Sequence, residues 1–161
     1  MHLAISANKD YQQRAIQLAN NYQLPLLANY PTVKPDFLLH YDETGLSLSS
    51  AKQNRSEKPL HIDFLAGKSR HRRLYGGGKG QQLAKAIGLH KIKQPHVIDA
   101  TAGLAKDAFV LATLGCTVTL IERTTPIYLL LNDALERVQQ SNDEHVKQIS
   151  SRMTLLHHNS Q

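Results

Sequence analysis

The sequence has very little cysteine and no long apolar run. Cys116 is the only cysteine among 161 residues, so neither an internal disulfide nor a cysteine-based metal cluster can form. No stretch approaches the roughly 18 apolar residues that a membrane-spanning helix needs. The first residues also lack the basic region and apolar run of a secretion signal. We therefore expect a cytoplasmic protein with no membrane contact.

A metal site is not indicated either. The chain has nine histidines, but none lies in a His-Glu-x-x-His arrangement. His157 and His158 are neighbours in an expected strand, so their side chains should point to opposite faces. Cys116 follows Gly115 at the start of an expected buried strand, where a free cysteine behaves as a small hydrophobic residue. We predict no metal and no reactive thiol.

Acidic residues are missing between Asp63 and Asp99, although the chain as a whole carries a net charge of +6. Eight cations fall in this interval: Lys68, Arg70, Arg72, Arg73, Lys79, Lys85, Lys91 and Lys93. The glycines beside these cations make the backbone flexible enough to wrap around RNA phosphates, and the Tyr75 ring can stack on a base. The candidates for RNA binding are Arg70, Arg72, Arg73 and Lys79. The plainer alternative is a solvated basic loop.

Residues 1–66 show the pattern of a small α/β domain. Short alternating apolar runs indicate strands, and apolar residues at i, i+3 and i+4 spacing indicate a helix. The expected elements are a strand at 3–6, a helix capped by Asp10, a strand at 24–27, a hairpin (37–41 and 46–50) and a strand at 60–64.

A basic glycine-rich segment with a helix at 81–87 follows at residues 67–95, and a more regular pattern occupies 96–161. Strands are expected at 96–99, 117–121 and 154–157, with helices at 107–114 and from Thr124 or Thr125 onward. Two successive β-α-β crossovers predict the parallel, right-handed sheet of a Rossmann-like α/β fold, with ligand binding at the carboxyl ends of its strands.

The loop from Asp99 to Asp107 joins the first of these strands to its helix, where such a sheet binds its cofactor. Gly-x-Gly-x-x-Gly is absent, and the carboxylate of Asp99 suits a cationic ligand better than a pyrophosphate. Glu122 follows 23 residues later, close to the spacing at which an acidic residue reaches ribose hydroxyls. S-adenosylmethionine, with an ammonium, a sulfonium and a ribose, fits this pair. The alternative is an ordinary β-α turn with solvated acids.

Three segments together resemble the small-subunit ribosomal RNA methyltransferase J family. They are His71 to Gly80 (HRRLYGGGKG), Asp99 to Asp107 (DATAGLAKD) and Glu122-Arg123. Members of that family methylate the N2 of a guanine in 16S rRNA. The resemblance runs from about Leu60 to the C-terminus, and the first 50 residues are only loosely similar to the family's N-terminal domain.

This resemblance implies S-adenosylmethionine as cofactor and 16S rRNA or the small ribosomal subunit as partner. It implies cofactor contacts from Asp99, Thr101, Gly103, Lys106, Asp107, Glu122, Arg123, Asn159 and Ser160. The chain departs from the family at Ala105, Lys106 and Asn159, where glycine, arginine and serine are usual.

The family also has an Asp-Pro-aromatic motif that holds the target base, and no Asp-Pro pair occurs in this sequence. We therefore expect a C-terminally truncated form whose site is open on one side, and we name no catalytic residue. Two alternatives remain: a non-catalytic module that binds RNA or nucleotides, and a nicotinamide-dependent oxidoreductase, which the glycine pattern disfavours.

Overall fold

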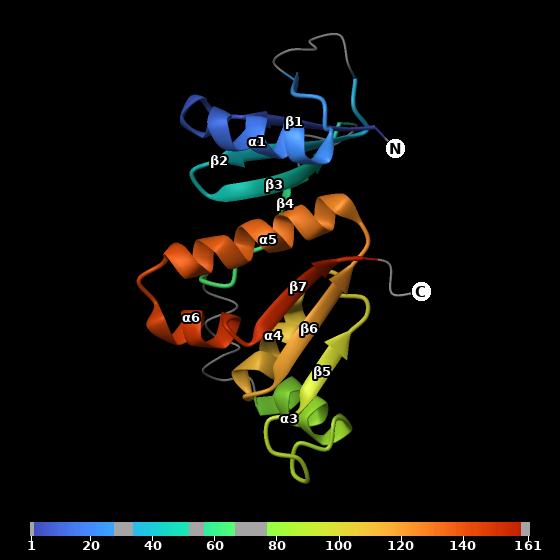
Figure 1. Cartoon of the computed structure of the whole chain (residues 1–161), viewed down its shortest axis with the longest axis vertical. Coiled ribbons are helices and arrows are strands. Elements are labelled where there is room, and N and C mark those ends of the chain that lie inside the picture. The colour runs from blue at the N-terminus through green and yellow to red at the C-terminus, as the bar shows by residue number, and fades with distance from the viewer. Residues whose placement is uncertain (1, 28–33, 52–56, 67–76, 159–161) are drawn as a thin grey trace. The chain divides into compact units, whose positions relative to one another are not determined.

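The computed structural model describes residues 2–27, 34–51, 57–66 and 77–158, with the backbone alone for 77–81. The chain divides into two compact units, Met1–Ile62 and Asp63–Gln161 (Figure 1). The sequence placed the first boundary after residue 66. The structure divides the chain earlier, because Asp63 and Phe64 interact with Arg137 and Phe109 of the second unit.

In its described residues, the first unit consists of a four-stranded sheet and one α-helix. The strands lie in the order β1 (Leu3–Ala7), β2 (Phe37–Asp42), β3 (Gly45–Ser50) and β4 (Leu60–His61). β1 and β2 are parallel, and the other two pairs are antiparallel. Helix α1 (Gln12–Tyr22) contacts β1 and β2, and it buries Ala15 and Ala19.

Three local expectations in this unit are wrong, and one of them is the strand at 60–64, which ends at His61. Asp10 does not cap the helix: it lies in a 3-10 turn (Lys9–Tyr11), and the residue before α1 is Tyr11, which makes no side-chain cap. Residues 24–27 form a single bridge between Leu26 and Ile5 instead of a strand. Pro25 accepts a hydrogen bond from Ile5 but has no N–H to donate, so it limits the ladder there.

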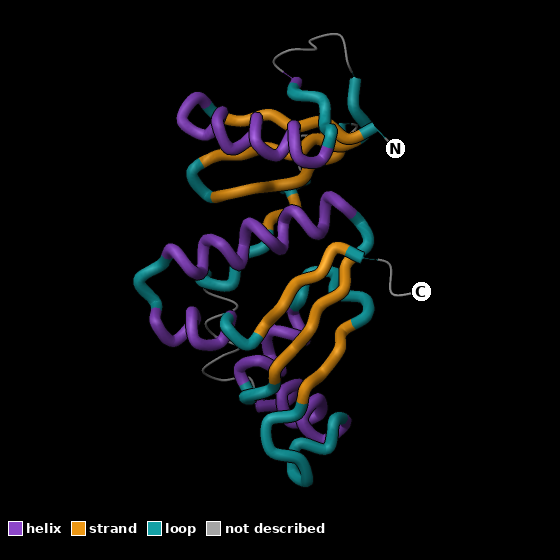
Figure 2. The backbone as a smooth tube through the Cα atoms, viewed as in Figure 1, coloured by secondary structure: helices purple, strands orange, loops and turns teal. Residues whose placement is uncertain are grey.

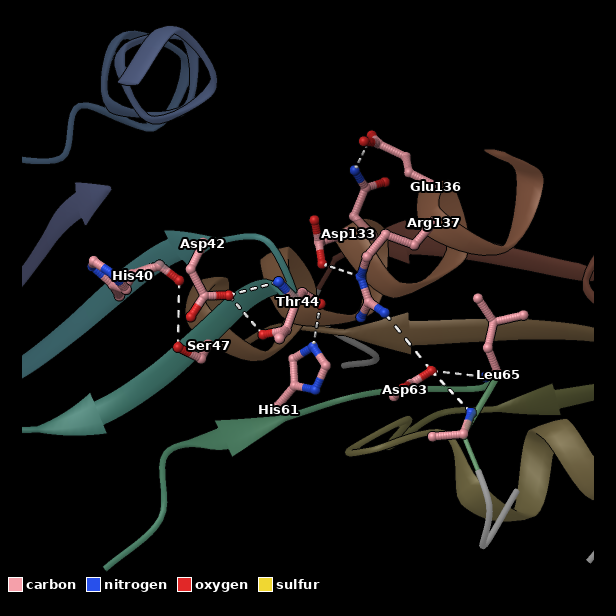
Figure 3. Close-up of polar contacts among 12 residues, drawn as sticks. His40, Asp42, Thr44, Ser47, His61, Asp63, Leu65, Asp133, Glu136 and Arg137 are labelled. Carbon is pink, nitrogen blue, oxygen red and sulfur yellow. Dashed lines mark hydrogen bonds and ion pairs between the residues drawn. The ribbon is translucent and has the colours of Figure 1, made fainter. Parts of the chain in front are cut away.

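The predicted hairpin is confirmed, and its turn is braced by side chains (Figure 3). Oδ1 of Asp42 accepts hydrogen bonds from the Thr44 hydroxyl at 2.6 Å and the Thr44 N–H at 2.8 Å. These bonds, led by that of the hydroxyl, hold the pKa of Asp42 below its ordinary value. The His61 ring donates from Nε2 to the Thr44 carbonyl at 2.9 Å, which ties β4 to the turn.

The second unit contains the predicted parallel sheet. Its strands lie in the order β5 (His96–Asp99), β6 (Thr117–Glu122) and β7 (Met153–His157). Figure 2 shows the three strands side by side. Helices α4 (Lys106–Thr113) and α5 (Thr125–Gln140) connect them and contact β6 and β7. The Rossmann-like α/β prediction is confirmed.

Two further helices complete the described part of this unit. Helix α3 (Gly77–Ala86) begins earlier than expected and contacts α4. Helix α6 (Glu144–Ser150) was not predicted, although Asp143 caps it by accepting a hydrogen bond from Val146 N–H at 3.1 Å. Among the described residues, no helix combines the length and the apolar content needed to cross a bilayer.

The two faces of the parallel sheet differ in burial. Val118 and Leu120 alternate on one face and are fully buried. Ile98 and Leu156 pair with Thr119 and Ile121 of β6, so they lie on the other face, where they are 62% and 45% exposed. Cys116 belongs to the buried core, and this burial raises the pKa of its thiol.

Candidate cofactor site

The loop between β5 and α4 is shaped by bonds from its own backbone. Asp99, the last residue of β5, accepts a hydrogen bond from Thr101 N–H at Oδ1, 3.2 Å away. Ala102 N–H donates to the Ile121 carbonyl at 3.2 Å, which holds the loop against the end of β6. Gly103 follows with φ of +50°, a left-handed conformation that glycine adopts without strain.

Glu122 joins this loop to the start of α5. It ends β6 and is 7% exposed. Its Oε2 accepts a hydrogen bond from Gly103 N–H at 3.1 Å, and its Oε1 accepts one from Thr124 N–H at 2.7 Å. One carboxylate thus fixes two backbone segments at the carboxyl edge of the sheet.

Ala105 closes the loop in a left-handed conformation that glycine adopts more readily than alanine. It precedes α4 with φ of +52° and ψ of +27°, and its N–H donates to the Ala102 carbonyl at 2.7 Å. A side chain in the left-handed region carries a strain that glycine avoids. Lys106 and Asp107 form the exposed first turn of α4.

The carboxyl end of β7 meets the same edge. His158 N–H donates to the Glu122 carbonyl at 3.1 Å. The His157 ring stacks on Tyr128 at a centroid distance of 4.5 Å, and its Nε2 lies 3.3 Å from the Thr125 hydroxyl. Sequence reasoning missed this contact, because the sequence marks Thr125 only as the start of a helix and does not show what faces it.

The structure thus gathers four of the predicted cofactor residues, Asp99, Thr101, Gly103 and Glu122, at neighbouring strand ends. Arg123 follows Glu122 and is exposed. Five predicted residues lie outside the described part of the chain: Asn159, Ser160, Arg70, Arg72 and Arg73. Lys79 belongs to α3, of which the structure gives only the backbone at that position.

The chemistry of this edge fits S-adenosylmethionine. A carboxylate has roughly four lone-pair sites, and the two N–H donors on Glu122 occupy two of them. Ribose hydroxyls can bond to the others. Asp99 and Asp107 at the same edge supply negative charge for an ammonium or sulfonium. In the described parts of the chain, no three His, Cys, Asp or Glu side chains are grouped to hold a metal ion.

Comparison with known families agrees with this fit. A family model described as "Putative SAM-dependent methyltransferase", where SAM is S-adenosylmethionine, matches residues 17–161. The chain belongs to this family. The cofactor in the family's description, S-adenosylmethionine, is the one predicted from the Asp99 loop and Glu122.

The curated relatives carry the family name that the sequence resemblance gave. A protein of Chromobacterium violaceum named "Ribosomal RNA small subunit methyltransferase J" is 45% identical over 147 residues, which cover 91% of this chain and 54% of the relative. A protein of the same name from Pseudomonas paraeruginosa is 44% identical over 153 residues, which cover 95% of this chain and 56% of the relative. The resemblance is confirmed, and the chain spans about half the length of these relatives.

A solved structure shows the same fold. The crystal structure of a SAM-dependent methyltransferase from Neisseria gonorrhoeae is 28% identical and superposes with a TM-score of 0.74. The match covers 98% of this chain and 60% of that protein.

Proposed function

We propose that this chain is the cofactor-binding and RNA-binding part of an enzyme that transfers a methyl group from S-adenosylmethionine to the N2 of a guanine in 16S rRNA. The observation that carries the proposal is the pair of hydrogen bonds by which Glu122 holds the Gly103 loop and the start of α5. Relatives named ribosomal RNA small subunit methyltransferase J support the class of substrate.

The chain's own residues would act by binding and orientation. Glu122 would accept hydrogen bonds from the ribose, and Asp99 and Asp107 would attract the cationic end of the ligand. When bound, S-adenosylmethionine would supply an electrophilic methyl on sulfur for attack by a guanine amino nitrogen, with S-adenosylhomocysteine as the leaving group and the amino proton released to water. Such a transfer depends mainly on alignment and electrostatics, so we assign no general base to these residues.

The RNA part of the proposal rests on charge. Phosphates would be contacted by Arg70, Arg72, Arg73 and Lys79. No acidic residue lies between Asp63 and Asp99, so no negative charge near them in the sequence would weaken their attraction for phosphate. The partner would be 16S rRNA or the small ribosomal subunit, and the cytoplasm remains the predicted location.

Binding of S-adenosylmethionine and of in vitro transcribed 16S rRNA to the full chain tests both parts. We expect saturable cofactor binding that Glu122→Ala weakens at least about tenfold, because a hydrogen-bonded charge contributes about 1.5–3 kcal/mol. We also expect the chain to bind RNA, and the logarithm of the association constant should fall linearly with the logarithm of the salt concentration. A folded chain that binds neither ligand contradicts the proposal.

A second candidate is an RNA-binding or nucleotide-binding module without catalysis. The observation that favours it is the run of cations without acidic residues between Asp63 and Asp99, which suits phosphate binding whether or not a methyl group is transferred. A methylation assay with radiolabelled cofactor separates the two. Label incorporated into 16S rRNA by this chain supports the enzyme, whereas cofactor and RNA binding without incorporation supports the module.

A further inference from the structure

The connection between α3 and β5 is closed by hydrogen bonds of its own backbone. Leu89 N–H donates to the Ala84 carbonyl at 2.9 Å. Gly88 N–H donates to the Lys85 carbonyl at 3.1 Å, and Gly88 has a left-handed φ of +68°. These two bonds and this conformation form a Schellman motif at the end of the helix. The Gly88 carbonyl then accepts from Lys91 N–H at 2.8 Å, so the backbone has a defined shape before any ligand binds.

Three exposed lysines belong to this region, and we call Lys85, Lys91 and Lys93 the basic tip. Among the described residues, no side chain forms an ion pair with any of the three. The sequence offers no acidic neighbour either, since none occurs between Asp63 and Asp99. The basic tip therefore concentrates positive charge that nothing in the described structure compensates.

Folding explains only part of this charge. Lys85 lies in the last turn of α3, where a cation offsets the helix dipole by about 0.3–1 kcal/mol. Lys91 and Lys93 follow the end of the helix and repel each other, because they are like charges two residues apart. A bound polyanion would turn this repulsion into attraction for all three side chains.

The basic tip lies at the edge of the parallel sheet opposite the cofactor loop (Figure 1). Thr117 N–H, at the start of β6, donates to the Pro95 carbonyl at 3.1 Å, so the connection ends beside the amino ends of the strands. The cofactor loop begins at the other end of β5, after Asp99. The length of β5 separates the two edges by about 10 Å, from the rise of about 3.3 Å per strand residue.

We propose that the basic tip is a second phosphate-binding surface for RNA, at the amino edge of the parallel sheet. The inference rests on the proposed function and adds to it an RNA contact outside residues 70–79. Phosphates bound there would belong to nucleotides other than the one at the cofactor edge, and they would position the RNA without reading its sequence. Because the backbone of the connection is already fixed, association requires little further ordering.

The test compares the full chain with its triple variant Lys85→Gln/Lys91→Gln/Lys93→Gln, and in vitro transcribed 16S rRNA is the probe. We expect the variant to bind RNA at least about tenfold more weakly at about 0.1 M salt. The slope of the logarithm of the association constant against that of the salt concentration should fall in magnitude by about 2–2.7, because three phosphate contacts at about 0.7–0.9 each are lost. Affinity for S-adenosylmethionine and the midpoint of urea unfolding should be unchanged, since the three side chains are exposed.

Three lysines of the first unit provide a control with the same change in net charge. Lys9, Lys34 and Lys58 are also exposed, but each has an acidic residue within two positions along the chain. The triple variant Lys9→Gln/Lys34→Gln/Lys58→Gln should keep the RNA affinity and the salt slope of the wild type. An unrelated RNA of equal length is the second control. The variant of the basic tip should lose affinity for it by the same factor, because phosphate contacts carry no sequence information.

The outcomes separate the two proposals. A wild-type chain that binds no RNA contradicts the proposed function. A wild-type chain that binds RNA, with unchanged affinity and slope in the variant of the basic tip, overturns the second surface alone. Equal losses in the two triple variants also overturn it, because they show a dependence on net charge and not on a site. A loss confined to 16S rRNA would overturn it as well, because the basic tip would then read bases.

Discussion

Gly103 N–H donates to Oε2 of Glu122 across 3.1 Å, and this bond connects the first loop of the parallel sheet to the end of its second strand. The other oxygen of the same carboxylate holds Thr124 N–H. Glu122 is therefore both a candidate ribose ligand and the residue that shapes the loop around the ligand. Loss of its charge should affect folding and binding together.

We expect Glu122→Gln to lower the free energy of unfolding by about 1–3 kcal/mol. The amide oxygen can still accept one of the two N–H bonds, but the amide nitrogen that replaces the other oxygen is a donor and cannot accept. Amide hydrogen exchange at Gly103 and Thr124 should become faster. Glu144→Gln, at a side chain that is 81% exposed, serves as the control and should stay within about 0.5 kcal/mol of wild type in the same urea titration. Unchanged exchange at both amides would contradict the bracing role.

Ala105→Gly should be neutral or stabilising by up to about 1 kcal/mol, because removing the methyl relieves left-handed strain that outweighs the greater freedom of the unfolded chain. Ala108→Gly, at a buried position inside α4, should destabilise the protein by about 1 kcal/mol or more. Thermal unfolding of the two variants measures the contrast. Equal destabilisation by both changes would show that Ala105 carries no strain.

Arg137→Met should destabilise the chain by about 3 kcal/mol, since it removes the guanidinium from the carboxylate of Asp133, which is only 2% exposed. Asp133→Asn keeps an acceptor for Arg137 Nε and should cost less, about 1–2 kcal/mol. Lys147→Met breaks the exposed pair with Glu144 and should change stability by less than about 1 kcal/mol. Chemical denaturation that ranks Lys147→Met as the most harmful would refute the assignment.

The two faces of the parallel sheet should respond differently to truncation. Leu120→Ala, on the buried face, should lower stability by about 2–5 kcal/mol. Ile98→Ala, at a position 62% exposed, should change it by less than about 1 kcal/mol. Equilibrium unfolding in urea gives both values, and similar losses would mean that Ile98 is covered in solution.

The sequence was sufficient to predict the parallel sheet, because apolar strands alternate with helical patterns from His96 onward. It also located the Asp99 loop and Glu122, whose spacing follows from a β-α-β unit. It could not show that Glu122 bonds to Gly103 and Thr124, since those contacts depend on how three segments meet in space. The stack of His157 on Tyr128 was invisible for the same reason.

The errors have local physical causes. Asp10 was expected to cap a helix from its residue type, but the chain makes a 3-10 turn there and the helix begins after Tyr11. The strand expected at 60–64 ends at His61, because the Asp63 side chain accepts a hydrogen bond from Leu65 N–H and so sets a turn. Asp63 and Phe64 also contact side chains distant in the sequence, Arg137 and Phe109, which the strand pattern could not show.

Calorimetric titration of the full chain with S-adenosylmethionine, and separately with S-adenosylhomocysteine, tests the central claim most directly. We expect saturable binding of one ligand per chain, weakened by Glu122→Ala and unaffected by Phe37→Leu, a control substitution in β2 of the first unit. Absence of binding by a chain shown to be folded by circular dichroism and cooperative unfolding would contradict it.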